Sequence, residues 1–226
     1  MTAAKGLMLA GMVATCALAA HASAAPAPPL FRLSITGTAH AEWDHSGAPT
    51  PFEGCDRTVR SEGIRNVRFR TAVPALVRVV NGKLSAATVR GLTGTVTLGG
   101  ANTTTDVCAT GQGSEAIADC AQTKRGFKKA TIAVVGGGGG TLTLRPVRNA
   151  RLRTSNCPRE PLDVVRAPLG PLPGPLRFSK SALTDDGVAR ITLHASKTGT
   201  VNYGPLETGR LAHRSVWKIT LERVDE

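Results

Sequence analysis

Aromatic side chains make up only 4% of the 226-residue sequence, and segments with helical periodicity are almost absent. No segment keeps apolar residues at the i, i+3, i+4, i+7 spacing over three turns, although Ser114 to Ala121 has room for one or two helical turns. Apolar residues still account for 41% of the chain, so a core built mainly from Val, Leu, Ile and Ala is expected. These scarcities argue against a helical bundle and favour a β-rich fold.

The sequence also lacks the motifs of common catalytic and metal sites. It has no Gly-x-Ser-x-Gly elbow for an activated serine and no Cys-x-x-Cys pair for zinc. The five glycines Gly136 to Gly140 are not followed by the Lys-Ser or Lys-Thr of a phosphate-binding loop. Residues for a serine-hydrolase site are present, but no local motif joins them: the possible bases are His194 and His213, and the possible nucleophiles are Ser46, Ser114 and Ser215. We therefore predict no catalytic residue and no cofactor.

The first 24 residues follow the order of a secretory signal peptide. Lys5 precedes an apolar run from Gly6 to Ala20, and Ala22-Ser-Ala24 supplies the small residues that signal peptidase requires. The run is shorter than the roughly 20 apolar residues of a spanning helix, and no second such run follows. Cleavage near Ala24 is expected, which makes the mature chain a secreted or cell-envelope protein without a transmembrane segment. A lipoprotein anchored through Cys16 is disfavoured, because threonine precedes that cysteine and the apolar run continues beyond it.

Cleavage would leave four cysteines, which in an exported chain are most simply two disulfides. Cys108 and Cys120 are close in sequence, and the glycines between them can form a turn, so this pair is favoured. Cys55 would then pair with Cys157, although the sequence alone allows all three connectivities.

Alternation of apolar and polar residues is the main structural signal. It runs from Phe31 to Trp43, with a bend or bulge expected at Gly37, and it recurs in several later segments. Asn81-Gly82 predicts a type I′ hairpin, and the five glycines suggest the tip of another. The predicted fold is all-β: an antiparallel β-sandwich, or a partly closed barrel, stapled by two disulfides.

The chain divides into a signal peptide (1–24), a Pro-rich arm (25–29) and a β domain (30–226). Six prolines between 158 and 175 predict an extended crossover, since proline lacks the ladder donor of a central strand. One domain is expected, and a division into halves 30–157 and 176–226 is the alternative.

The formal charge is +12, and loss of Lys5 with the signal peptide leaves +11. A basic exterior attracts polyanions, such as anionic cell-wall polymers and acidic glycans. The candidate residues for this binding are Arg65, Arg68, Arg70, Arg151 and Arg153. A merely solvated, arginine-rich surface would carry the same charge, and no specific nucleic-acid site is predicted.

A metal site is a second hypothesis, because His40, Glu42 and Asp44 fall on one face of the first predicted strand. Imidazole and carboxylates are ligands for Zn²⁺, Mn²⁺ or Ca²⁺. Residues two apart on a strand stand roughly 7 Å apart, however, so a solvent-facing strand surface explains them equally well.

The large aromatic residues give little sign of a binding platform. Trp43 and Trp217 lie in phase with aliphatic neighbours, which predicts burial in the core. Tyr203 lies in a loop-like segment and is the better surface candidate.

Several short motifs occur in a fixed order along the mature chain: Trp43 in an alternating strand, Cys55-Asp56, Cys108, Asp119-Cys120, Cys157-Pro158 and the strand Val216 to Leu221. This order resembles uncharacterised exported proteins common in high-GC actinobacteria. The resemblance spans most of the mature chain and implies shared disulfides and a shared fold, but no activity.

We therefore expect a non-enzymatic exported protein that acts as a binding or structural module and contacts anionic wall polymer. A secreted hydrolase or metal-dependent enzyme with an unfamiliar site, and a scaffold without a ligand, are the alternatives. The oligomeric state is open.

Overall fold

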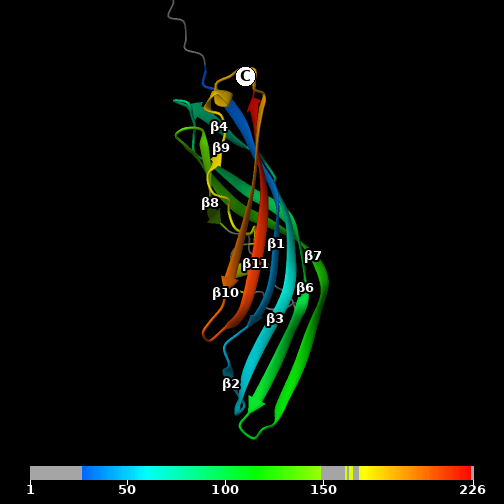
Figure 1. Cartoon of the computed structure of the whole chain (residues 1–226). Coiled ribbons are helices and arrows are strands. Elements are labelled where there is room, and N and C mark those ends of the chain that lie inside the picture. The colour runs from blue at the N-terminus through cyan, green and yellow to red at the C-terminus, as the bar shows by residue number, and fades with distance from the viewer. Residues whose placement is uncertain (1–26, 149–160, 162, 165–167, 225–226) are drawn as a thin grey trace, which may run out of the picture.

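In the computed structural model the chain is an elongated, curved molecule made almost entirely of β-strands (Figure 1). The structure describes residues 27–148, 161, 163–164 and 168–224, apart from the side chains of 120–125, 127–129 and 148. The predicted signal peptide, with Cys16 and Ala24, lies outside the described residues, and so do Arg151, Arg153 and Cys157. No helix in the described part is long and apolar enough to cross a membrane.

The described part contains a short 3-10 helix, η1 (Lys180–Leu183), and the strands β1 (Leu30–Ser46), β2 (Thr50–Phe52), β3 (Cys55–Thr71), β4 (Ala75–Val80), β5 (Lys83–Leu84), β6 (Ala87–Cys108), β7 (Gly113–Gly137), β8 (Thr141–Arg148), β9 (Leu176–Arg177), β10 (Arg190–Asn202) and β11 (Thr208–Val224). They form one antiparallel sheet in the order β10-β11-β1-β3-β6-β7-β8-β9. β2 pairs with β3, β4 with β1, and β5 with β4. The predicted all-β antiparallel fold is confirmed.

The strands belong to a single hydrogen-bonded network, and no ladder between β10 and β9 closes it. The described residues therefore establish an antiparallel sheet but not a sandwich of two sheets. The long central ladder joins β1 to β11 without interruption, from Leu30 opposite Val224 to Ser46 opposite Thr208. The N-terminal end of β1 and the C-terminal end of β11 thus lie at the same end of the sheet.

Alternation separates an inner face, which carries the core, from an outer face. On β1 the side chains of Phe31, Leu33 and Ile35 are completely buried, whereas the even-numbered neighbours are exposed or half-buried. One core cluster includes residues from β1, β7 and β11, so segments from both ends of the chain share it. Trp43 and Trp217 are 2% and 0% exposed, which confirms the prediction that both are core residues.

Gly37 does not interrupt the sheet, so the bulge predicted there is wrong, while the predicted bend stays a prediction. The registers of β1 with β11 and with β3 continue through this position. A Cβ atom at Gly37 would lie 2.5 Å from Cζ of Phe69 and still closer to the Val216 carbonyl oxygen. The glycine therefore makes room for the Phe69 ring, which packs on Trp217 with ring centroids 4.7 Å apart.

The Asn81-Gly82 turn between β4 and β5 has positive φ at both residues, as the predicted hairpin requires. Gly138 to Gly140 form the predicted turn between β7 and β8, whereas Gly136 and Gly137 pair with β8 as the end of β7. Ser114 to Ala121 is not helical. It lies in β7, because pairing with β6 outweighs its weak local preference. The described part of the Pro-rich crossover before β9 contains no strand, as expected.

Beyond the core, β3, β6 and β7 continue as a narrow extension, drawn at the lower end of Figure 1, and the short β2 pairs with the edge of its β3 strand. We define this distal blade as Cys55–Arg60, Thr103–Cys108 and Gly113–Ile117. Its side chains are half-buried or exposed on both faces. The blade therefore depends on ladder hydrogen bonds and cross-strand side-chain pairs rather than on a core.

We expect Gly37→Ala to destabilise the protein by about 1–3 kcal/mol, because the added methyl group must displace Phe69 or the β11 backbone. Gly47→Ala is the matched control, since its nearest contact would be the Val59 carbonyl oxygen at an ordinary 3.7 Å. Urea unfolding of the two variants measures the difference. Equal stabilities would show that Gly37 has no packing role.

Candidate functional site

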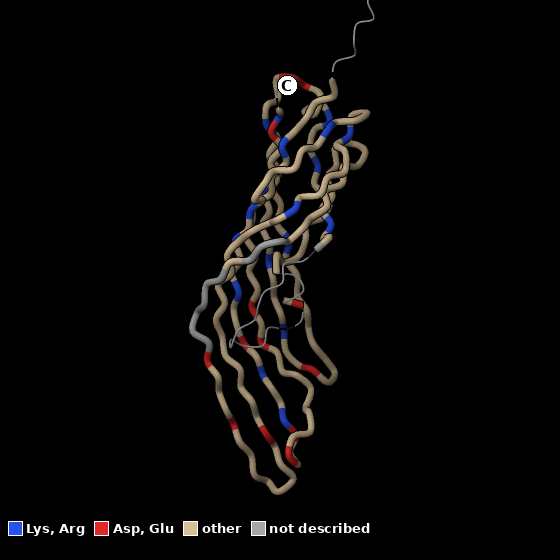
Figure 2. The backbone as a smooth tube through the Cα atoms, turned by 180° about the vertical axis from the view of Figure 1, so that it is seen from behind, with Lys and Arg blue, Asp and Glu red and all other residues tan. Residues whose placement is uncertain are grey.

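Charged residues are segregated along the long axis of the molecule. Figure 2 shows Lys and Arg concentrated in the upper part and Asp and Glu prevailing towards the lower end. The chain alternates between these parts several times, so the segregation arises from the fold and is not visible as two blocks in the sequence.

Cations gather on the outer face in three cross-strand rows that pass through Thr36, Thr38 and His40 of β1. β3 and β11 flank β1 and contribute four exposed basic side chains, which we call the basic band: Arg68, Arg70, Arg214 and Lys218. The neighbouring strands β10 and β6 contribute only neutral or imidazole side chains to these rows: His194, Ser196, Thr198, Thr93, Thr95 and Thr97. No described position in the three rows carries a carboxylate.

None of the four cations of the basic band forms an ion pair within the described part of the chain. Some arginines elsewhere are paired: Arg57 with Asp106, Arg60 with Asp44, and Arg223 with Asp186. Like charges without counter-charges raise the local positive potential, and no described carboxylate in these rows offsets it. The basic band is therefore the strongest candidate for anion binding among the described residues.

A shallow hollow lies within the basic band, between the side chains of Arg68 and Arg70. Apart from Phe69, its other lining residues are small or polar: Thr93, Gly94, Thr95 and Gly126. The glycines leave space at the sheet surface, and guanidinium groups and hydroxyls border it. Arginine presents a planar fork of donors that matches carboxylate and phosphate oxygens.

Arg65 does not belong to this surface, so the predicted set of five arginines is wrong at this position. Its side chain is only 2% exposed and donates a hydrogen bond to the Val164 carbonyl oxygen. The physical reason is the period of two: Arg65 shares the inner face with Val67 and Phe69, whereas Arg68 and Arg70 point outward. Arg151 and Arg153 lie outside the described residues, and their part in the prediction is untested.

The same outer face becomes acidic towards the distal blade. We define the acidic region by six exposed carboxylates: Glu42, Asp44, Asp56, Glu62, Glu115 and Asp119. Arg60 and Arg210 are the basic residues among them, which leaves a formal charge of −4. Arg60 donates two hydrogen bonds to Asp44, and these hold the pKa of the Asp44 carboxyl below its usual value.

The three residues of the metal hypothesis share the outer face, as the alternation predicts. His40 is hydrogen-bonded to Asn66, with 2.9 Å between Nδ1 and Oδ1, and Asp44 is paired with Arg60. No cluster of His, Cys, Asp and Glu in the described part is arranged to hold a metal ion. The structure thus does not bring His40, Glu42 and Asp44 together as ligands.

A polar cluster lies on the inner face, beside the smaller core cluster that includes Trp43 and Leu211. The Tyr203 hydroxyl donates to Asp163 at 3.1 Å, and burial together with this contact raises the pKa of Tyr203 above its ordinary value. His213 is half-buried in the same region, where burial lowers the pKa of its imidazole. Arg65 lowers that pKa further, whereas Asp163 opposes the shift. Tyr203 is therefore not the free surface aromatic that its loop context predicts.

This cluster does not assemble a nucleophile with a base. Ser215 is completely buried and donates to the Pro171 carbonyl oxygen. Ser114 donates to Asp106, and His194 lies on the outer face. His45 contacts Glu207, with 3.1 Å between Nε2 and Oε2, and in the described part of the chain this pair forms no hydrogen bond with a serine. The fold thus forms no hydrogen bond between a serine and a histidine of the hydrolase hypothesis.

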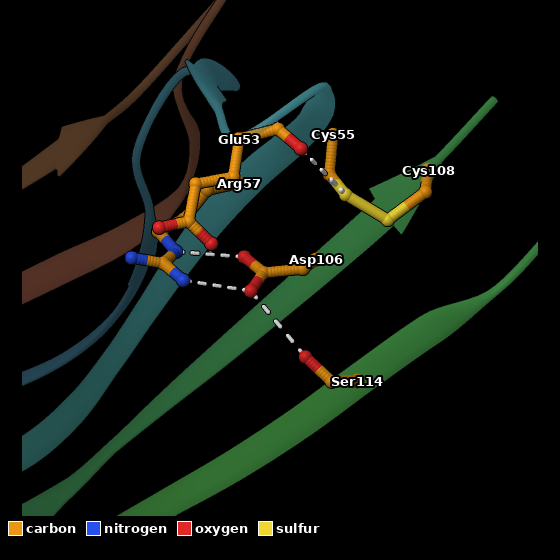
Figure 3. The surroundings of a disulfide bond; sticks show 6 residues. All are labelled: Glu53, Cys55, Arg57, Asp106, Cys108 and Ser114. Atoms are coloured by element: carbon orange, nitrogen blue, oxygen red, sulfur yellow. Dashed lines mark hydrogen bonds and ion pairs between the residues drawn. A yellow bond between two sulfur atoms is a disulfide. The ribbon is translucent and has the colours of Figure 1, made fainter.

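A disulfide joins Cys55 to Cys108 at the tip of the distal blade (Figure 3). On the same inner face, Arg57 donates two hydrogen bonds of 2.7 Å to Asp106, which also accepts one from Ser114. These contacts lower the pKa of the Asp106 carboxyl. The bridge and the polar contacts together link all three strands of the blade.

The favoured cysteine pairing, Cys108 with Cys120 and Cys55 with Cys157, is wrong. Cys55 and Cys108 lie directly opposite in the β3–β6 ladder, 53 residues apart in sequence. Sequence proximity misled the prediction because the turn after Cys108 carries the chain into β7, where Gly113 pairs with Val107. The Cys120 side chain and all of Cys157 lie outside the described residues.

Sequence reasoning missed Arg214 and Lys218, half of the basic band. Alternation around Trp217 already indicates that both face away from the core. The missing information was the strand order, which places β11 next to β1 and so brings these residues to the same rows as Arg68 and Arg70.

In comparisons with known proteins, neither a family model, a curated protein nor a solved structure matches this chain.

Replacing both cysteines in Cys55→Ser/Cys108→Ser should lower the free energy of unfolding by about 2–4 kcal/mol, because the bridge restricts a long loop of the unfolded chain. Urea unfolding measures the loss. Non-reducing peptide mapping of the unaltered chain provides the control, and a Cys55 peptide linked to any partner other than Cys108 would contradict the structure.

The lowered pKa of His213 predicts a pH-dependent contribution to stability. Its unfolded imidazole titrates near 6.5, so the contribution is fully present above this pH and is lost as the pH falls below it. An NMR titration should place the His213 midpoint below 6.5. His213→Gln should flatten the stability profile in this range, and an unchanged profile would rule out the assignment.

Proposed function

We propose that this chain is an exported, non-enzymatic module that binds anionic polymer of the cell envelope through the basic band. The observation that carries the proposal is the set of four exposed cations in rows free of described carboxylates. The net charge of the whole chain and the order of its N-terminal segment support a basic protein exported to a compartment rich in polyanions.

The arrangement suits an extended ligand better than a small one. Side chains two apart on a strand stand roughly 7 Å apart, and strands separated by one neighbour lie roughly 10 Å apart. The basic band therefore spreads its charges over several strands of an open face. A polymer with repeated anionic groups can contact several of these cations at once, whereas a single small anion reaches one or two.

One finer feature of the fold, a second disulfide, belongs with this proposal. The disulfide between Cys55 and Cys108 leaves Cys120 and Cys157 as the remaining cysteines of the mature chain. We infer that these two form a second bridge, as oxidation outside the cytoplasm favours. A mature chain with no free thiol before reduction is the expected result of thiol titration.

Arg68→Gln/Arg70→Gln should weaken binding to an anionic polymer roughly tenfold or more at low salt, since each lost contact costs on the order of 1 kcal/mol near a polyanionic surface. Fluorescence anisotropy with labelled polyphosphate and with polyglutamate measures binding to phosphate and to carboxylate polymers. Raising the salt should weaken binding by the unaltered chain, because screening acts on exposed charges.

Arg78→Gln/Arg90→Gln is the matched control, because both arginines are exposed, lie outside the three rows and remove the same formal charge. The proposal requires this variant to bind nearly as well as the unaltered chain. Equal losses in the two variants would mean that net charge, and not the basic band, determines binding. No binding at low salt would remove the proposed function altogether.

A further inference from the structure

Exposed aliphatic side chains gather on the outer face at the end of the sheet where β1 begins. Val73 is 72% exposed, Leu76 61% and Val80 52%. Leu76 and Val80 belong to β4, where they alternate with the buried Val77 and Val79, so the strand directs both exposed groups outward. We call Val73, Leu76 and Val80 the aliphatic patch.

Val73 protrudes because the chain bulges between β3 and β4. Both strands pair antiparallel with β1, but the segment Thr71–Pro74 stands against only Ser34 and Ile35 in the register. The Thr71 hydroxyl accepts a hydrogen bond from the Ile35 amide and donates one to the Ile35 carbonyl oxygen, which fixes the base of the bulge. The extra residues of the bulge leave Val73 in solvent.

Each aliphatic group of β4 has a cation beside it. Leu76 lies opposite Arg32 of β1, and Val80 lies opposite Lys83 across the hairpin turn. Arg78 stands between Leu76 and Val80 on the same face. All three cations are exposed, and none of them forms an ion pair within the described part of the chain.

The aliphatic patch has few carboxylates near it. The sequence contains none from residue 63 to residue 105, a stretch that includes all of β4 and β5. At the same end of the sheet, Glu222 is paired with Arg190, and Asp186 with Arg223. The cations beside the aliphatic patch therefore remain available to an anionic partner.

We propose that the aliphatic patch docks on the surface of an anionic lipid bilayer. Exposed aliphatic groups mark interaction surfaces, and aliphatic groups interleaved with cations suit the boundary between lipid headgroups and acyl chains. Val73, Leu76 and Val80 enter this boundary, while the neighbouring arginines and lysine extend their charged ends to the headgroup phosphates.

The course of the chain before β1 favours a bilayer as the partner. The Pro29 carbonyl oxygen accepts a hydrogen bond from the Val79 amide, so the chain enters the sheet beside the aliphatic patch. The apolar run of the expected signal peptide ends at Ala20, nine residues earlier, and nine residues reach at most roughly 30 Å. Before cleavage, a signal peptide held in the membrane therefore keeps the aliphatic patch close to the membrane surface.

Flotation of the mature chain, residues 25–226, with unilamellar vesicles tests the proposal. We expect binding to vesicles of phosphatidylglycerol and phosphatidylcholine in equal parts. Binding to phosphatidylcholine alone should be about tenfold weaker or more, because the cations need anionic headgroups. A chain that floats with neither kind of vesicle at low salt would overturn the proposal.

Val73→Ser/Leu76→Ser should lower the vesicle partition coefficient about tenfold or more, since it removes two aliphatic groups from the contact and leaves every cation in place. Ile117→Ser/Leu206→Ser is the matched control, because these side chains are 63% and 74% exposed but lie in the distal blade and in the turn between β10 and β11. The control should bind like the unaltered chain. Equal binding by all three proteins would show that the aliphatic patch does not touch the bilayer.

Tryptophan fluorescence provides a second measurement, which does not depend on a loss of binding. Trp43 and Trp217 are buried in the core, so a tryptophan added at the surface accounts for any change that vesicles cause. The emission of Leu76→Trp should shift to the blue when anionic vesicles are added, because the indole ring enters a less polar environment. The emission of Leu206→Trp should not change. An unshifted Leu76→Trp spectrum would contradict the proposal.

A second copy of the chain is the competing occupant of the aliphatic patch. Analytical ultracentrifugation without lipid should show no self-association that depends on these residues. Self-association that Val73→Ser/Leu76→Ser abolishes would assign the aliphatic patch to a protein interface and overturn the lipid contact.

This inference goes beyond the proposed polymer binding and depends on different residues, so the two can fail separately. Val73→Ser/Leu76→Ser keeps the basic band and should bind polyphosphate or polyglutamate like the unaltered chain. A chain that binds polymer but no vesicle loses only the lipid contact. A chain that binds anionic vesicles through the aliphatic patch, but neither polymer, loses only the proposed function.

Discussion

The ladder between β1 and β11 is the interaction on which the rest of the structure depends. It pairs 17 residues of β1 with 17 of β11 in one continuous register, and these segments lie at opposite ends of the chain. Its inner side carries Trp217, Phe31 and Leu33, which form part of the main core. Its outer side brings Arg214 and Lys218 next to the β3 arginines. One set of backbone hydrogen bonds thus determines both the core and the charged surface.

Local features of the fold were predictable where short-range physics determines them. The alternation from Phe31 to Trp43, the positive-φ pair Asn81-Gly82 and the burial of Trp217 all follow from residues close in sequence. The burial of Arg65 was available from the same alternation, since it has the parity of Val67 and Phe69. What the sequence could not supply was the order of the strands, because ladders such as β1–β11 depend on contacts between distant segments.

The same division between local and long-range information applies to the candidate site. Arg68 and Arg70 were predicted because they alternate with apolar residues within one strand. Their neighbours on β11 become visible only when that strand is placed beside β1. The disulfide is a parallel case, since Cys55 and Cys108 meet through the β3–β6 register and not through proximity along the chain. Hydrophobic periodicity within single strands therefore does not predict the surfaces that several strands form together.

The separation of charge along the molecule gives it a permanent electric dipole moment. In a field, such as the one that surrounds a negatively charged wall, a dipole experiences a torque before any contact is made. The molecule would approach with its cationic pole leading and the disulfide-linked blade trailing. The way this sheet distributes its ionised side chains therefore determines how the molecule orients in such a field.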